Sequence, residues 1–70
     1  MMHYAIAIEK TPNSYSAYPP DLPGCAATGA SLAEVQQKIK EAIEFHLEGL
    51  REEGLPIPEP TTLCEYVEAG

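Results

Sequence analysis

The chain has 70 residues, a formal net charge of −7 and a hydrophobic content of 44%. This length allows one small domain, residues 1–70, whose core supplies only about 3–5 kcal/mol before other reinforcement. The apolar content excludes wholesale disorder. The acidic surface makes nucleic acid a poor partner and a basic protein a good one.

The first expected element is a strand from His3 to Lys10, because large and small side chains alternate along it. Residues 11–14 have the composition of a turn, so residues 15–18 should pair with this strand as a hairpin. Tyr4, Ile6 and Ile8 form the face expected to be buried, whereas Ala5 and Ala7 lie on the opposite face.

A proline-rich turn follows the hairpin. Pro23 fixes φ and Gly24 tolerates a positive φ, so residues 22–25 suit a type II turn. We expect a third short strand from Cys25 to Gly29.

The longest expected element is a helix from about Leu32 to Glu53, whose apolar positions fall within a stripe about 120° wide. Ser31 and Glu34 form a capping box, in which the Glu34 carboxylate reaches back to the Ser31 N–H. Gly54 suits the position after the helix. The predicted core comprises Tyr4, Ile6, Ile8, Val35, Ile39, Ile43 and Leu50.

Three prolines keep residues 55–60 extended, and we expect Thr61 to Glu68 to return to the sheet as a last strand. The order of elements is therefore βββαβ. The fold class is α+β, with one long helix on one face of a small antiparallel sheet.

The turn Pro-Asp-Leu-Pro-Gly-Cys at residues 20–25, the capped helix, and Gly-Leu-Pro-Ile-Pro at residues 54–58 together resemble the N-terminal domain of the HicB antitoxin family. The resemblance implies a partial RNase H-like fold. It also implies a partner, since HicA toxins are small basic RNA-cleaving proteins of double-stranded-RNA-binding fold that use a histidine.

The expected function is therefore that of an antitoxin, which neutralises a small basic HicA-like mRNA-cleaving toxin by covering its active site. The alternatives are an orphan oligomerisation domain, or a catalytically inactive RNase H-like remnant without a toxin partner. The candidate toxin contacts are Tyr18, Asp21, Glu44 and Glu48.

We expect no enzyme, metal or cofactor. The histidines and cysteines stand roughly twenty residues apart and lack the close pairs of a metal site. The thiols of Cys25 and Cys64 should be inert, and His46 should lie at the edge of the core. The carboxylates of Glu9, Asp21 and Glu65 do not form the converging set that a two-metal nuclease requires.

A homo-oligomer, most simply a C2 dimer, is expected because one helix covers only one sheet face and the core is small. Phe45 falls off the apolar stripe, one turn from an interior glycine, which favours an interface there. The candidate interface residues are Ala5, Ala7, Ala42, Phe45 and Gly49.

The first residues lack the pattern of a signal peptide, and no apolar run is long enough to span a membrane. We therefore expect a cytoplasmic protein with reduced thiols. Many HicB relatives carry a DNA-binding segment after this domain, whereas this chain stops at Gly70. Direct DNA binding is therefore not expected.

Overall fold

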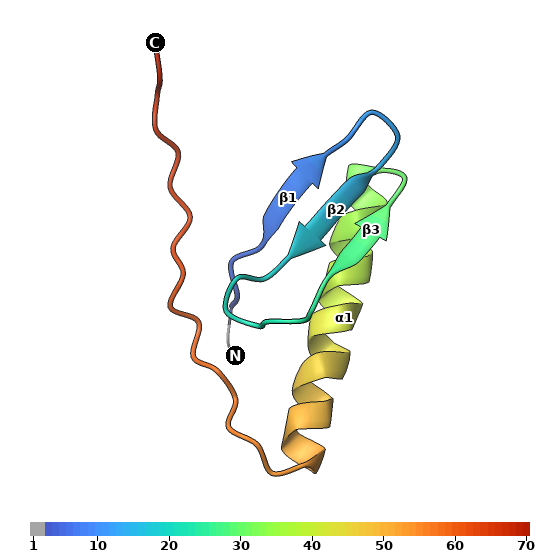
Figure 1. The fold of residues 1–70 in the computed structure, drawn as a ribbon, viewed down its shortest axis with the longest axis vertical. Helices are drawn as coiled ribbons and strands as arrows, with labels where there is room; N and C mark the ends of the chain where they lie inside the picture. The colour runs from blue at the N-terminus through green and yellow to red at the C-terminus, as the bar shows by residue number, and fades with distance from the viewer. Residues whose placement is uncertain (1–2) are drawn as a thin grey trace.

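The computed structural model describes residues 3–70 as a three-stranded antiparallel sheet with one long helix on one face (Figure 1). The strands follow the order β1-β2-β3, so β2 is central and the outer sides of β1 and β3 are edges. The elements are β1 (Ala7–Lys10), β2 (Tyr15–Tyr18), β3 (Ala27–Gly29) and α1 (Leu32–Glu52). The α+β class is confirmed, although β1 and β3 begin later than expected.

The register of the sheet decides which side chains face the helix. Ile8 pairs with Ala17, and Ala7 pairs with Tyr18. Directly paired residues share a face, and neighbours along a strand point to opposite faces. Ala17 is buried and Ile8 packs against the core, so these two face α1. Ala7 and Tyr18 therefore lie on the face of the sheet that α1 leaves uncovered.

Two consecutive tight turns link β2 to β3 and carry Leu22 into the core. The Leu22 N–H donates to the Pro19 carbonyl at 3.1 Å, and the Cys25 N–H donates to the Leu22 carbonyl at 3.2 Å. Gly24 has a φ of 84°, as the third residue of a type II turn requires. The predicted turn is confirmed, and it buries Leu22 almost completely.

The buried core lies between α1 and the β2–β3 half of the sheet. Ile43 and the first-strand residues Tyr4, Ile6 and Ile8 are partly buried and pack against this core. The prediction that Leu50 belongs to the core is wrong, because Leu50 is only half-buried and does not pack against the buried core residues. By that position the helix has extended past the end of the sheet (Figure 1). The buried apolar residues of this core are Ala17, Leu22, Cys25, Val35 and Ile39.

Side chains and backbone close both ends of α1. The Ser31 hydroxyl accepts the Glu34 N–H at 3.1 Å, as expected for the N-cap. The Glu34 carboxylate accepts the N–H of Ala30 rather than that of Ser31, so this half of the predicted capping box is displaced by one residue. At the other end Gly54 has a φ of 70°, and the Leu55 N–H donates to the Leu50 carbonyl at 2.9 Å. These features form a Schellman motif.

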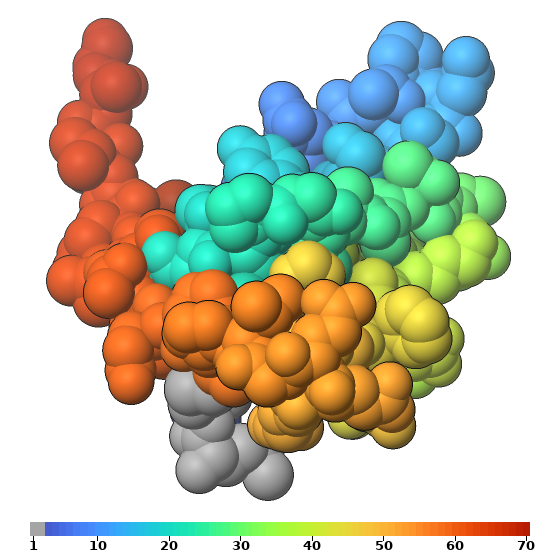
Figure 2. Space-filling model, turned by 60° about the horizontal axis from the view of Figure 1, so that its bottom comes forward, coloured from blue at the N-terminus to red at the C-terminus, as the bar shows by residue number. Residues whose placement is uncertain are grey.

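The expected fourth strand, Thr61 to Glu68, is not formed. Residues 61–68 are extended but pair with no strand in the part of the chain that the structure describes. They stand away from the sheet, beyond the outer edge of β1 (Figures 1 and 2). A hollow of about 270 Å³ separates residues 62–66 from residues 5–7. The prolines make this segment extended, but an extended backbone without a neighbour at hydrogen-bonding distance is not a strand of a sheet.

Two glycines, one just before α1 and one within it, give a matched pair of alanine substitutions that should change the stability of the fold in opposite directions. A Cβ on Gly29 would lie 2.7 Å from the backbone nitrogen of Val35, whereas a Cβ on Gly49 would meet nothing within 4 Å. Gly29→Ala should destabilise the fold by about 1–3 kcal/mol, since backbone must shift. Gly49→Ala should stabilise it by about 0.5–1 kcal/mol, as in other helix interiors. Urea unfolding of both variants measures this, and equal effects would contradict the packing described.

Candidate functional site

A row of carboxylates follows the solvent side of α1. Spacings of three or four residues place these side chains on one helix face. An exposed aromatic ring, that of Phe45, lies on the same side and is 80% exposed. The acidic stripe, as we call this surface, consists of Glu41, Glu44, Phe45, Glu48 and Glu52. A ring bordered by carboxylates suits a partner that presents Lys or Arg side chains, which bind both groups.

Tyr18 lies on a different surface. It ends β2 and points away from α1, on the uncovered face of the sheet, where Ala7 is its cross-strand partner. Its side chain is 44% exposed. The structure therefore brings Glu44 and Glu48 together on the acidic stripe but does not bring Tyr18 to them. The candidate toxin contacts predicted from the sequence form two surfaces rather than one.

Asp21, the fourth candidate, holds the chain that follows the helix. Its carboxylate accepts the backbone N–H groups of Thr61 at 3.1 Å and of Thr62 at 3.0 Å. It also accepts both hydroxyls, at 3.1 Å from Thr61 and 2.8 Å from Thr62. The hydrogen bonds from Thr62, then those from Thr61, hold the pKa of Asp21 below its usual range. Asp21 therefore joins two segments 40 residues apart in sequence.

A second bond supports the same connection from the first segment of the chain. The Tyr4 hydroxyl donates to the Pro58 carbonyl at 2.5 Å. Burial, followed by the nearby carboxylates of Glu59 and Asp21, raises the pKa of Tyr4. Residues 58–62 are thus fixed at both ends, by Tyr4 and by Asp21. No feature of the local sequence pattern indicates either contact, because each one links segments at least 40 residues apart.

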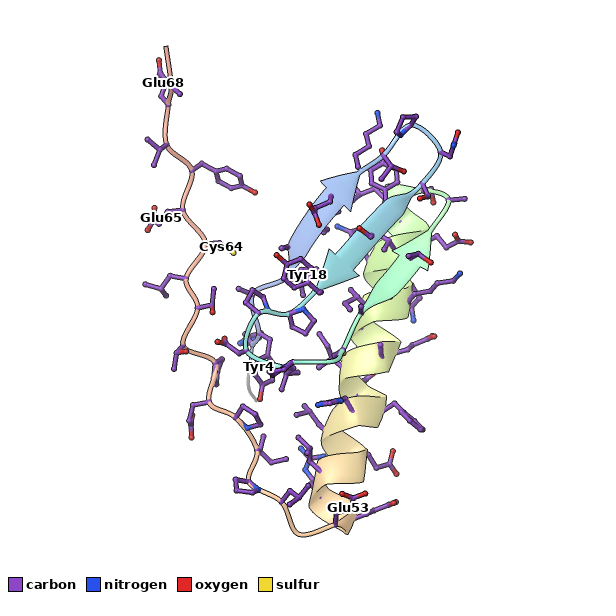
Figure 3. The ribbon with its side chains drawn as sticks, viewed as in Figure 1. Tyr4, Tyr18, Glu53, Cys64, Glu65 and Glu68 are labelled. Carbon is purple, nitrogen blue, oxygen red and sulfur yellow. The ribbon has the colours of Figure 1, made fainter. Side chains whose placement is uncertain are left out.

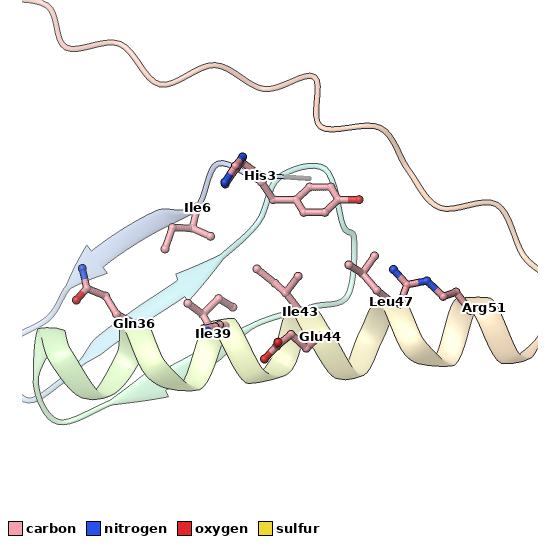
Figure 4. Close-up of a pocket in the computed structure, with 10 residues that line it drawn as sticks. His3, Ile6, Gln36, Ile39, Ile43, Glu44, Leu47 and Arg51 are labelled. Carbon is pink, nitrogen blue, oxygen red and sulfur yellow. The ribbon is translucent and has the colours of Figure 1, made fainter. Parts of the chain in front are cut away.

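A groove of about 650 Å³ runs between the first strand and α1 (Figure 4). It exists because α1 lies over β2 and β3 and not over β1. Its walls are apolar. The side chains of His3, Lys40 and Arg51 lie at its margins, together with the carboxylate of Glu44. This groove was not predicted from the sequence. Its signal in the sequence is the excess of apolar residues on the first strand, more than one helix can cover. The apolar side chains that line it are Ile6, Ile39, Ile43 and Leu47.

The five candidate interface residues also separate. Ala5 and Ala7 precede or lie in β1, with Ala7 on the uncovered sheet face. Ala42 packs against the core of its own chain. Phe45 belongs to the acidic stripe, and no other part of the described chain approaches Gly49.

The thiols and the carboxylates show no sign of a reactive centre. Cys25 is buried, and burial raises the pKa of its thiol, which disfavours the thiolate. Cys64 is exposed and free. Within residues 3–70 no three His, Cys, Asp or Glu side chains are grouped as a metal site would require. A search of the same residues found no helix with the length and hydropathy needed to cross a membrane.

The attachment of residues 61–62 should depend on pH. The pKa of Asp21 in the folded protein is below its ordinary value of 3.8. The attachment is therefore complete above that value and is lost as pH falls through the lowered pKa. The protection of the Thr61 and Thr62 amides, measured as their hydrogen-exchange rate relative to the intrinsic rate at the same pH, should fall on acidification. Asp21→Asn should lower this protection already at neutral pH, because an amide cannot accept all four bonds. Unchanged exchange in Asp21→Asn would contradict the attachment.

Comparison with known proteins gives the family. The family described as "HicB_like antitoxin of bacterial toxin-antitoxin system" matches residues 4–70. A 14.9 kDa protein of Haemophilus phage HP1, from its rep-hol intergenic region, is 39% identical over 66 residues, which are 94% of this chain and 50% of the phage protein. A UPF0150 protein of Archaeoglobus fulgidus is 46% identical over 48 residues, covering 67% of this chain and 70% of that protein.

The fold has a solved relative as well. A chain of the structure titled "HicA3 and HicB3 toxin-antitoxin complex" is similar with a TM-score of 0.72 and 37% identity, over 84% of this chain and 69% of that one. The present chain thus spans only half of its phage relative and about two thirds of the solved one. On the match over residues 4–70, this chain belongs to the HicB-like antitoxin family of bacterial toxin–antitoxin systems.

Proposed function

We propose that this protein neutralises a small basic HicA-like toxin, an mRNA-cleaving ribonuclease, by binding it and covering its active site, with no catalysis of its own. The observation that carries the proposal is the likeness to a chain of a HicA3–HicB3 toxin–antitoxin complex, at 37% identity and a TM-score of 0.72. Family membership over residues 4–70 supports it. The net charge of −7 is complementary to a basic partner.

The acidic stripe is the surface that we assign to the toxin. Four exposed glutamates give it the charge that attracts a basic protein, and Phe45 gives it an aromatic centre. Aromatic residues surrounded by polar contacts are typical of the residues that dominate binding energy. Glu44 and Glu48, which the sequence analysis selected, lie in the middle of this stripe.

The same charges argue against the stripe as a contact between two copies. In a C2 interface a patch meets its own copy, so the glutamates around Phe45 would face glutamates. Like charges at such distances cost binding energy. We therefore move Phe45 from the self-association surface, where the sequence analysis placed it, to the toxin surface. Tyr18 is the candidate for a second toxin contact, on the uncovered sheet face.

We also propose that the protein forms a homo-oligomer, most simply a C2 dimer. The domain has a small core, and one helix leaves both a sheet face and a groove uncovered. Small domains of this kind gain stability by association. The proposal concerns a surface other than the acidic stripe, so that a dimer can bind toxin through each stripe.

Charge reversal on the acidic stripe should abolish neutralisation. The test is to co-express this chain with the small basic protein encoded beside it and to measure growth. Glu44→Lys with Glu48→Lys should weaken binding at least about tenfold, because both charges would oppose the toxin. Glu59→Lys with Glu68→Lys makes the same change in net charge away from the stripe and from the uncovered sheet face, and should still rescue growth.

Three other outcomes of this experiment decide between the surfaces. A basic protein that is harmless alone, or that stays toxic despite abundant unmodified product, would overturn the antitoxin proposal. If the control pair failed to rescue growth while Glu44→Lys with Glu48→Lys still rescued it, the acidic stripe would not be the toxin-binding surface. Tyr18→Ala tests the sheet face separately, and full rescue by that variant would exclude Tyr18 from the contact.

Salt should act mainly on the rate of association. Steering between an acidic stripe and a basic toxin is screened over about 10 Å at 0.1 M ionic strength. The association rate constant should therefore fall steeply as salt rises, while the dissociation rate constant changes little, since the desolvated centre around Phe45 is not screened. Stopped-flow or surface plasmon resonance across a salt series measures both constants. A salt-independent association rate would contradict electrostatic recognition.

A further inference from the structure

Residues 63–68, which we call the arm, have the properties of a strand without a sheet. They are extended, and no hydrogen bond is formed by them within residues 3–70. Their large apolar side chains are almost fully in solvent: Leu63 is 85%, Tyr66 99% and Val67 87% exposed. Cys64 points toward the sheet and Glu65 away from it (Figure 3). Each face of the arm thus carries two apolar or thiol side chains and one glutamate.

Within residues 3–70, the outer edge of β1 has no neighbouring strand. Among the described strands β1 pairs with β2 alone, so its outward N–H and C=O groups are open for another strand. The groove lies directly on the helix side of this edge, with Ile6 and Ile43 among its walls (Figure 4). A strand added here would therefore gain hydrogen bonds from β1 and an apolar surface from the groove at the same time.

The charge of the groove indicates what fits it. Lys40 and Arg51 line it against the single carboxylate of Glu44, although the whole chain has only 4 Lys and Arg against 11 Asp and Glu. The groove is thus locally positive in an acidic protein. It disfavours a basic toxin and favours an apolar segment that carries carboxylates. The arm, with Glu65, Glu68 and no basic residue, is such a segment.

We infer that the arm of one copy adds as a strand to the outer edge of β1 in a second copy and lays its apolar side chains in that copy's groove. Each copy has one arm and one groove, so the exchange is reciprocal and closes as a C2 dimer. The inference rests on the self-association proposed above and assigns its surface. Of the residues of the acidic stripe, Glu44 alone also lines this groove.

Two features favour exchange over folding back within one chain. The arm is fixed where it begins, by the four hydrogen bonds from Thr61 and Thr62 to Asp21, on the far side of the hollow beside residues 5–7. The single chain is also expanded. Its radius of gyration is 13.4 Å, against about 11 Å for a compact domain of this length. Exchange would cover the arm and the groove together.

The first test is the oligomeric state of the full chain by analytical ultracentrifugation. The unmodified protein should be a dimer at micromolar concentration. Tyr66→Lys with Val67→Lys should shift the dissociation constant at least tenfold toward monomer, and its helical circular dichroism should stay unchanged, because both side chains are in solvent. Phe45→Lys, which changes another exposed apolar side chain outside the arm and the groove, is the control and should leave the dimer intact.

The second test distinguishes exchange from folding back. A donor with its native Cys64, or with Glu65→Cys and Cys64→Ser, is mixed with an acceptor that carries Ala5→Cys or Ala7→Cys together with Cys64→Ser. Mild oxidation should give a disulfide between donor and acceptor chains, mapped by mass spectrometry. When Ala7→Cys is introduced into a chain that keeps Cys64, the product should be a covalent dimer. The two donor positions cover both faces of the arm.

The outcomes separate the two proposals. A monomeric unmodified protein would overturn both self-association and arm exchange. A dimer that survives the arm variant but is broken by Phe45→Lys would leave self-association standing and overturn the exchange. An intrachain disulfide between residues 7 and 64 as the main product would also overturn it, since the arm would then pair with its own β1.

Discussion

One helix over three strands is the constraint on which the rest of this structure depends. α1 packs on β2 and β3, and the buried core lies beneath that contact. β1 is held by its hydrogen bonds to β2 and by the partial packing of Ile6 and Ile8. The groove beside β1, the open edge and the uncovered sheet face all follow from this shortage of covering surface. The same shortage explains why a domain of this size presents so many surfaces that suit partners.

The surfaces differ in charge, and this difference separates the roles that we propose for them. The solvent side of α1 carries the acidic stripe, whereas the groove on its other flank has a positive balance from Lys40 and Arg51. A basic protein is attracted to the first and repelled from the second. An acidic, apolar strand has the opposite preference. The two contacts that we propose therefore use different sides of one helix, which meet at Glu44.

Local signals in the sequence predicted the local structure well. The Pro23-Gly24 turn, the Ser31 cap and the Gly54 stop all form as expected, because each depends on neighbours within a few residues. Leu22 was missed as a core residue, since no periodic pattern marks an apolar side chain in a turn. The fourth strand was wrong for a related reason: the composition of residues 61–68 indicates an extended backbone, but a sheet also requires an edge within reach.

In the candidate site, too, features set by nearby residues could be predicted and features set by tertiary contacts could not. Helical spacing was enough to place Glu44 and Glu48 on one surface, but their separation from Tyr18 follows from the sheet register and from which face α1 covers. The attachment of Thr61 and Thr62 to Asp21 joins residues 40 apart and has no local signal. Local patterns in the sequence can therefore select candidate residues but cannot assign them to surfaces.

The prolines between the helix and the arm have an entropic consequence. Pro56, Pro58 and Pro60 restrict the backbone of that segment in the unbound protein, and proline-rich stretches act as semi-rigid spacers. The two attachments, at Tyr4 and at Asp21, remove further freedom before any partner arrives. A flexible tail loses about 1–2 kcal/mol of conformational entropy for each residue that binding orders. For residues 56–62 that loss occurs during folding, so the residues beyond Thr62 start from a fixed origin.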